Sequence, residues 1–296
     1  MPSPLETDAP PTLVCVNGSI GVSEVMRAAR VLETEALVAM LKRISEDVVE
    51  MARHGLMSTE VAQHLTSGTL LDECQAMEPM LDSALADRRH VLDGLRFVYT
   101  SRVSWALFTV EWMDGLTRVL NAMGAQRVLE VCCGLNVLAG PMVKRGVQWT
   151  ATERAPPNGR EVSAPEVCGA LEALSRHRLG SDDGPDVVFF SWWSGEETDE
   201  DFLVVAECLE NGVPVIFVGE GAGGCTGSSM LWTSGLPIGR MYDTARQLGV
   251  AFVDVPCWDH CSDCTWVVDP KLVVAPAKRS APAREHVGEQ GASAAT

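Results

Sequence analysis

Two carboxylates and the tight turn between them are the residues of this 296-residue chain whose types and spacing could do chemistry. Glu130 lies near the end of a short apolar run, which then turns through residues 132–136 into a second apolar run. About twenty residues after the turn opens, another short segment ends in Glu153. Strand, tight turn, helix, strand and acid in this order are typical of a nucleotide-binding βαβ unit. Backbone N–H groups and a helix N-terminus approach the ligand there, and the second acid can bind a ribose diol.

The segment RVLEVCCGLNVLAGPM resembles the first motif of class I S-adenosylmethionine-dependent methyltransferases, whose usual form is acid-x-Gly-x-Gly-x-Gly. The resemblance covers roughly residues 99 to 269. It implies a Rossmann-like, mostly parallel α/β sheet with an antiparallel edge pair, S-adenosylmethionine as the cofactor, and methyl transfer. The acidic net charge of the chain favours a small-molecule or protein acceptor over a nucleic acid. In that motif Glu130 takes the acid position, and the three glycine positions fall on Cys132, Gly134 and Asn136. Glu153 corresponds to the acid that binds the ribose. The resemblance implies that all five residues bind the cofactor.

Two of the three glycine positions of the motif carry other residues. Asn136 tolerates a positive φ better than most non-glycine residues. Cys132 brings a Cβ and a sulfur to a place where the backbone must approach the ligand. The sequence therefore leaves two interpretations open. The chain is either an active methyltransferase, or a non-catalytic scaffold or binding protein on the same fold. A nicotinamide-dependent oxidoreductase fits less well, because its fingerprint needs glycines at the positions that Cys132 and Asn136 hold.

Further candidates lie where other apolar runs end, because ligands of open α/β sheets bind at the carboxyl ends of the strands. Ser191 and Trp192 are expected to face the cofactor. Trp192 or Trp193 could line the substrate pocket or contact the sulfonium of the cofactor. The alternative for each tryptophan is that it only packs against neighbouring side chains. Tyr99 is expected to belong to a lid over the cofactor or to pack between helices. Glu220 is the first choice for a general base, if one is needed.

The glycine-rich segment GEGAGGCTGSS, residues 219–229, follows directly after an apolar run. So many glycines predict special backbone angles or a close approach to a ligand, and a surface loop is the alternative. The segment does not match a phosphate-binding loop, because the Lys-Ser/Thr pair is absent.

The elements that must position these residues fall into four sections. We expect a disordered N-terminus over 1–20, a helical extension over 21–97, a Rossmann-like methyltransferase domain over 98–272 and a disordered tail over 273–296. Within the extension, helices are predicted from Ser23 to Gly55, through STEVAQHL, and over much of LLDECQAMEPMLDSALADRRHVLDGL.

In the predicted α/β domain, Thr109 can cap a helix that ends at Gly124. Near-continuous apolar runs predict central strands at Val187–Phe190 and Val215–Val218, which a parallel sheet covered on both faces requires. We further expect a helix over residues 237–249 and, as the antiparallel edge pair, strands at AFVDVP and TWVVD.

Composition and charge limit the partners. The formal net charge of −17 and the lack of a large basic cluster argue against a nucleic-acid partner.

No apolar run is long enough to span a bilayer, and the N-terminus does not resemble a signal peptide. With ten cysteines at irregular spacing, the sequence therefore predicts a cytoplasmic protein with reduced thiols. Its oligomeric state stays open.

One cluster has the residue types of a zinc site. Cys257, His260, Cys261 and Cys264 all lie within CWDHCSDC. Structural zinc sites usually join two separated ligand pairs, so the sequence favours reduced, partly buried thiols over a metal site. No metal is expected.

Overall fold

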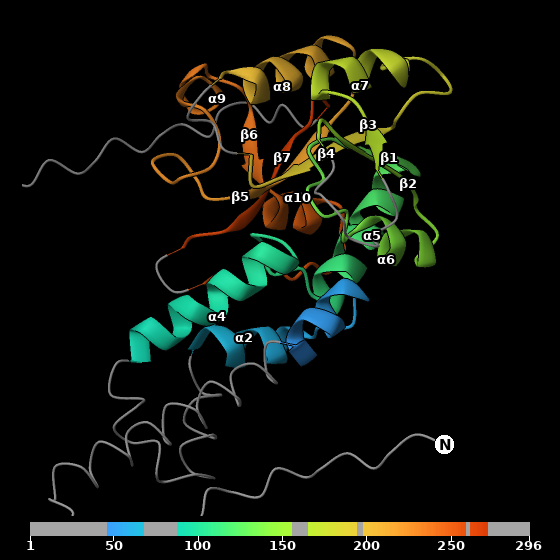
Figure 1. Ribbon diagram of the computed structural model, residues 1–296. Coiled ribbons are helices and arrows are strands. Elements are labelled where there is room, and N and C mark those ends of the chain that lie inside the picture. Colours follow the sequence, from blue (N-terminus) through green and yellow to red (C-terminus); the bar gives the residue numbers. More distant parts are fainter. Residues whose placement is uncertain (1–45, 68–87, 156–164, 194–197, 259–260, 272–296) are drawn as a thin grey trace, which may run out of the picture.

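A twisted sheet of seven strands forms the centre of the molecule (Figure 1). The computed structural model describes residues 46–67, 88–155, 165–193, 198–258 and 261–271. The strand order is β3-β2-β1-β4-β5-β7-β6. The strands are β1 Arg127–Glu130, β2 Gln148–Glu153, β3 Glu166–Val167, β4 Val187–Ser191, β5 Val215–Gly219, β6 Ile238–Arg240 and β7 Cys264–Val268.

The five strands from β3 to β5 pair in parallel, whereas β7 runs antiparallel to both β5 and β6. The predicted architecture, a mostly parallel Rossmann-like sheet with an antiparallel edge pair, is confirmed.

Helices cover both faces of the sheet (Figure 1). One face packs against α5 Val110–Met123, α6 Ala139–Lys144 and α10 Met241–Gln247, and the other against α7 Ala170–Arg176, α8 Glu200–Glu210 and α9 Ser229–Thr233. Alternate residues of one strand enter the two cores: Phe189 of β4 packs on the α5 side and Phe190 on the α8 side. Burial on both faces explains why the central strands are continuous apolar runs.

The helix that leads into β1 begins and ends as the sequence predicts. Thr109 accepts a hydrogen bond from the backbone N–H of Trp112 through its side chain, and so caps α5. Gly124 ends the helix in the left-handed conformation, with φ of 73°. The predicted strands Val187–Phe190 and Val215–Val218 are also present, each extended by one residue.

The edge of the sheet differs from the prediction. The helix expected over 237–249 begins only at Met241, because Ile238–Arg240 form β6 and pair with β7. Residues 251–256, predicted as the second edge strand, form no strand. Since β6 already occupies the free edge of β7, this segment instead buries Phe252 and Val255 in the core beside α5.

A second group of helices lies beside the sheet and has its own core (Figure 1). It contains residues 46–53, α2 Thr59–Ser67 and α4 Arg88–Arg102. The predicted helix through STEVAQHL is confirmed as α2. The expected domain boundary between 97 and 98 falls inside α4, which runs on to Arg102.

Several expectations concern residues outside the described ranges: the termini at 1–20 and 273–296, the start of the first helix at Ser23, and His260. Among the helices that the structure describes, none has the length and apolar character needed to cross a membrane.

Candidate functional site

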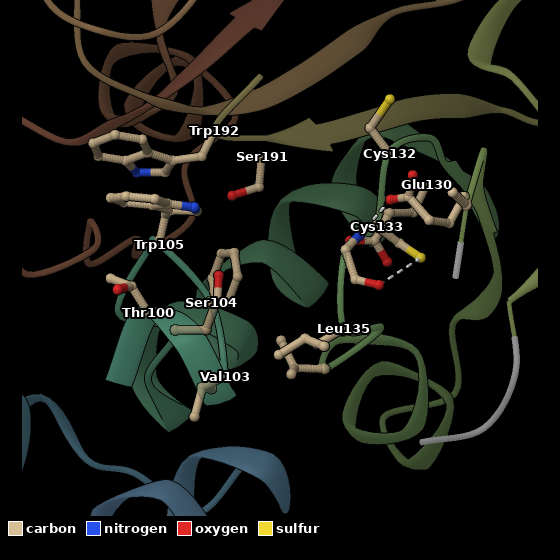
Figure 2. Close-up of a pocket in the computed structure, with 15 residues that line it drawn as sticks. Thr100, Val103, Ser104, Trp105, Glu130, Cys132, Cys133, Leu135, Ser191 and Trp192 are labelled. Carbon is tan, nitrogen blue, oxygen red and sulfur yellow. Dashed lines mark hydrogen bonds between the residues drawn. The ribbon is translucent and has the colours of Figure 1, made fainter. Parts of the chain in front are cut away.

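A pocket of about 330 Å³ opens at the carboxyl ends of β1, β2 and β4 (Figure 2). The turn after β1 forms one wall, and the end of α4 with the connection to α5 forms the opposite wall. Its volume lies at the lower end of the range for small-molecule sites, about 300–1,000 Å³. The pocket brings together six of the predicted cofactor-binding residues: Glu130, Cys132, Gly134, Glu153, Ser191 and Trp192.

The turn after β1 has left-handed backbone at all three positions that correspond to motif glycines. The φ angles are 54° at Cys132, 55° at Gly134 and 52° at Asn136. Conformations of this kind cost a non-glycine residue about 1–3 kcal/mol and persist only where the surroundings impose them. The turn therefore keeps the conformation that favours glycine although two of its glycines are replaced.

Cys132 is one of the residues that line the pocket. It packs against the core on the α8 side of the sheet, and in Figure 2 its sulfur points away from the tryptophan pair on the opposite wall. Asn136 is buried and lies behind the pocket rather than in its lining. Its backbone N–H donates to the carbonyl of Cys133 at 3.0 Å, which closes the turn.

Glu153 joins the turn to the end of β2. Its Oε2 accepts a 2.8 Å hydrogen bond from the backbone N–H of Gly134, and its Oε1 accepts one of 2.9 Å from the N–H of Arg154. Each carboxylate oxygen has further lone pairs. The carboxylate therefore holds the turn and can still accept hydrogen bonds from a ligand hydroxyl in the pocket.

Glu130 is buried at the base of the pocket, with 3% of its surface exposed. Its Oε2 accepts a 2.7 Å hydrogen bond from the indole Nε1 of Trp149 on β2. Burial raises the pKa of Glu130 to about 8, the Trp149 hydrogen bond lowers it, and the charge of Glu153 raises it. A cation bound beside Glu130 would favour the ionised form. Sequence reasoning missed Trp149, whose spacing from Glu130 carries no motif.

Two tryptophans stack at one end of the pocket. The rings of Trp105 and Trp192 have centroids 5.3 Å apart at an interplanar angle of 20° (Figure 2). Trp192 has φ of 51°, again left-handed, directly after β4 ends. Trp105 comes from the α4–α5 connection and is half exposed. Sequence reasoning did not single out Trp105, because its partner lies far along the chain.

Two buried polar groups near this pair have no hydrogen-bond partner within the described part of the chain. Ser191 Oγ lies in the pocket wall, between the tryptophan pair and the turn after β1 (Figure 2). Both carboxylate oxygens of Asp263, just before β7, are also without a partner. Sequence reasoning did not single out Asp263.

Besides Asn136, the structure places two more predicted site residues, Tyr99 and Glu220, outside the pocket lining. Tyr99 is buried in α4 and packs edge-on against Trp258, with ring centroids 5.5 Å apart. Glu220 follows β5, and its Oε2 accepts a 2.5 Å hydrogen bond from the backbone N–H of Cys225. Its carboxylate therefore stabilises the glycine-rich loop. Trp193 packs on the α8 side of the sheet, against Phe190.

The glycine-rich loop folds back onto the strand from which it leaves. A Cβ at Gly219 would lie 2.6 Å from Oγ1 of Thr226, whose hydroxyl donates to the carbonyl of Glu220 at 2.9 Å. At Gly219, the close approach predicted from the glycines is therefore between two parts of the same loop.

The cysteine-rich segment holds thiols without disulfides. Cys257, Cys261 and Cys264 are free, and burial raises the pKa of the Cys257 thiol to about 11. Within the described residues, no group of three or more potential metal ligands comes together.

Comparisons with known proteins found no matching protein family and no matching curated protein. Solved structures with a similar fold include magnesium protoporphyrin IX methyltransferase from Synechocystis PCC 6803 with bound SAM, at 11% identity over 52% of this chain and 76% of that chain, with a TM-score of 0.29. A SAM-dependent methyltransferase from Archaeoglobus fulgidus matches at 10% identity over 53% of this chain and 94% of that chain, with a TM-score of 0.30. The methyltransferase domain of bacterial CtHen1 matches at 14% identity over 54% and 97%, with a TM-score of 0.28. Because these TM-scores are below 0.5, the fold is assigned from the strand order and pairing.

Proposed function

We propose that the chain binds S-adenosylmethionine in the pocket after β1 and transfers its methyl group to a small-molecule or protein acceptor. The observation that carries the proposal is the turn itself. Its three motif positions are left-handed, and it lies between the buried acid Glu130 and the acid Glu153 at the end of β2. The coincidence of the motif's spacing with this backbone supports a nucleotide-type ligand.

The charges of the residues that line the pocket favour this cofactor. Among the described residues, the lining includes two acids, Glu130 and Glu153, and no Lys or Arg. A ligand that carries positive charge is therefore favoured over an anion. We propose that Glu153 accepts hydrogen bonds from the ribose hydroxyls and that Glu130 faces the positive charge of the amino-acid part.

Ser191 and Trp192, with the partner Trp105, are proposed to line the reacting end of the pocket. When bound, S-adenosylmethionine would supply a methyl group on a positively charged sulfur. The stacked indoles present aromatic surface to a cation at this end. An acceptor with a free lone pair at this end would take the methyl group, and the sulfur would become neutral. The protein's contribution is alignment of donor and acceptor.

Glu220 remains a candidate base, but it can act as one only if its carboxylate moves. Its carboxylate would have to leave the N–H of Cys225 to reach a substrate in the pocket. Glu220→Gln tests the role: an unchanged pH profile of turnover would remove Glu220 as a base.

A non-catalytic binding protein on the same fold is the second candidate. It is favoured by one observation: the Gly134 N–H, an amide that a ligand could use, already donates to Glu153. In this alternative the turn is a structural clamp rather than a cofactor site.

Isothermal titration of the full chain with S-adenosylmethionine and S-adenosylhomocysteine separates the two candidates. We expect binding that weakens by about tenfold or more in Glu153→Ala, a loss of about 1.4 kcal/mol. Glu172→Ala, at an exposed position on α7, is the matched control and should bind as the unmodified chain does. A folded protein that binds neither ligand would overturn the proposal and favour the scaffold; Cys132→Gly would then test whether the cysteine blocks the site.

A further inference from the structure

Arg96 lies on α4, one helical turn before the residues of that helix that line the pocket. Thr100, Val103 and Ser104 belong to the lining, and Arg96 precedes them by four, seven and eight positions. Residues at these spacings share one face of a helix. Arg96 therefore continues the pocket-facing side of α4, and its side chain is partly exposed.

Trp105 connects Arg96 to the pocket. The guanidinium carbon of Arg96 lies 6.0 Å from the centroid of the Trp105 ring, within the range of a cation–π contact. The same ring lines the pocket and stacks on Trp192 (Figure 2). Half of the Trp105 surface is exposed to solvent. A ligand that contacts this exposed surface from the pocket therefore comes close to the guanidinium, which lies at the rim.

The guanidinium of Arg96 keeps its hydrogen-bond donors available. Three other arginines around the sheet form ion pairs: Arg127 with Asp186, Arg145 with Asp114 and Arg154 with Glu200. Burial raises the pKa of Asp263 to about 7, and the charge of Arg96 lowers it. Yet neither carboxylate oxygen of Asp263 accepts a hydrogen bond within the described residues. The five N–H donors of the guanidinium are therefore not used by this acid.

The charges of the pocket and of α4 have opposite signs. Glu130 and Glu153 line the pocket, where the positively charged cofactor is proposed to bind. The helix α4 contains four arginines and one aspartate, although the whole chain carries a net charge of −17. A negatively charged group that approaches the site is therefore repelled by the acids of the pocket and attracted to Arg96 at its rim.

We propose that the methyl acceptor carries a carboxylate, which Arg96 binds at the rim of the pocket while the adjoining part of the acceptor packs on Trp105. The proposal rests on the proposed function, and it adds the class of acceptor and the residue that selects it. The planar guanidinium matches a carboxylate through two parallel hydrogen bonds. An acceptor with an ammonium group in this place would be repelled by Arg96, and a neutral one would gain no charge pairing. The nucleophilic atom is a separate group of the acceptor, which reaches into the pocket.

The test uses benzoate as the probe and benzamide, of similar shape and without charge, as its control. Ligand-observed NMR titrations of the full chain at pH 7.5 and low salt measure both dissociation constants, with saturating S-adenosylhomocysteine and again without it. At this pH benzoate is ionised, since carboxyl groups have pKa values of about 4. We expect benzoate to bind at least about tenfold more tightly than benzamide.

Three variants locate the carboxylate partner. Arg96→Gln removes the charge, and it should weaken benzoate binding by about tenfold while leaving benzamide binding unchanged. Arg96→Lys keeps the charge without the planar fork, so its benzoate affinity should lie between those of Arg96→Gln and the unmodified chain. Arg102→Gln, at an exposed position on another face of α4, is the matched control and should bind both probes as the unmodified chain does. Thermal unfolding checks that each variant is folded.

Equal affinity for the two probes in the unmodified chain would overturn the proposal. Unchanged benzoate binding in Arg96→Gln would do the same, and so would an equal loss in Arg102→Gln, which would indicate a general attraction to α4 rather than a site.

The S-adenosylhomocysteine titration is read separately. If that ligand binds and the preference for benzoate is absent, only the carboxylate acceptor is rejected. If it does not bind, the proposed function fails, and the titrations without it still decide whether Arg96 forms a carboxylate subsite.

Discussion

The backbone N–H of Gly134 donates a 2.8 Å hydrogen bond to Oε2 of Glu153, which joins the turn after β1 to the end of β2. Gly134 has φ of 55°, and an added Cβ would meet nothing within 4 Å. The contact therefore depends on backbone conformation rather than on space. It places the acid and the turn on the same side of the pocket, where both would face one ligand.

Removing this contact should loosen the turn even without a ligand. We expect Glu153→Ala to lower the free energy of unfolding by about 1–2 kcal/mol, because two backbone N–H donors lose a charged acceptor. Glu153→Gln keeps one acceptor oxygen and should cost less. Urea denaturation measures both, with Glu172→Ala as the control. Equal stability of Glu153→Ala and the unmodified chain would show that these two hydrogen bonds do not contribute to the free energy of unfolding.

The buried acid Glu130 should make stability depend on pH. Its pKa in the folded protein is about 8, above the ordinary value of 4.5. Between these values the folded protein keeps a proton that the unfolded chain has released, so stability falls as pH rises through this window. Glu130→Gln lacks the effect. The stability of the variant relative to the unmodified chain should therefore rise from pH 5 to 8, by at most about 1.4 kcal/mol per pH unit.

Trp149→Phe provides the matched test of the Glu130 environment. The indole N–H favours the ionised carboxylate, so its removal should raise the pKa of Glu130 further and extend the loss of stability to higher pH. Thermal unfolding in buffers from pH 5 to 9 measures the series. A stability difference between Glu130→Gln and the unmodified chain that stays constant with pH would contradict the shift.

The left-handed conformation at Cys132 predicts an order between two substitutions. Cys132→Gly and Cys132→Ala both remove the sulfur and its contacts with the α8-side core. Only glycine relieves the φ of 54°, so Cys132→Gly should be more stable than Cys132→Ala by about 1–2 kcal/mol. Chemical denaturation of the pair measures the difference. The reverse order would mean that the turn relaxes without glycine.

The start of the glycine-rich loop should not tolerate a side chain. In Gly219→Ala the new Cβ would lie 2.6 Å from Thr226 Oγ1, so the loop or the end of β5 must shift. We expect a loss of about 1–3 kcal/mol, measured by thermal unfolding. Gly140→Ala is the control: it lies in α6, where an added Cβ meets nothing within 4 Å, and helix propensity favours alanine by up to about 1 kcal/mol.

Local patterns in the sequence were enough for the elements that depend on near neighbours. Thr109 and Gly124 determine the ends of α5, since capping involves residues within one helical turn. The apolar runs of β4 and β5 indicate strands buried on both faces. The acid, the turn and the second acid, at their spacing, were sufficient to locate the pocket wall at Glu130, Gly134 and Glu153.

Only the tertiary structure decided which distant residues meet. Trp149 contacts Glu130 because β2 pairs with β1, and Trp105 stacks on Trp192 because the α4–α5 connection passes the end of β4. Asp263 comes beside Trp192 through the antiparallel pairing of β5 with β7. Two segments were candidates for the strand beside β7. Because β6 occupies that edge, residues 251–256 pack in the core instead. Such contacts follow from register and edge occupancy, which arise from the whole sheet and leave no local periodicity in the sequence.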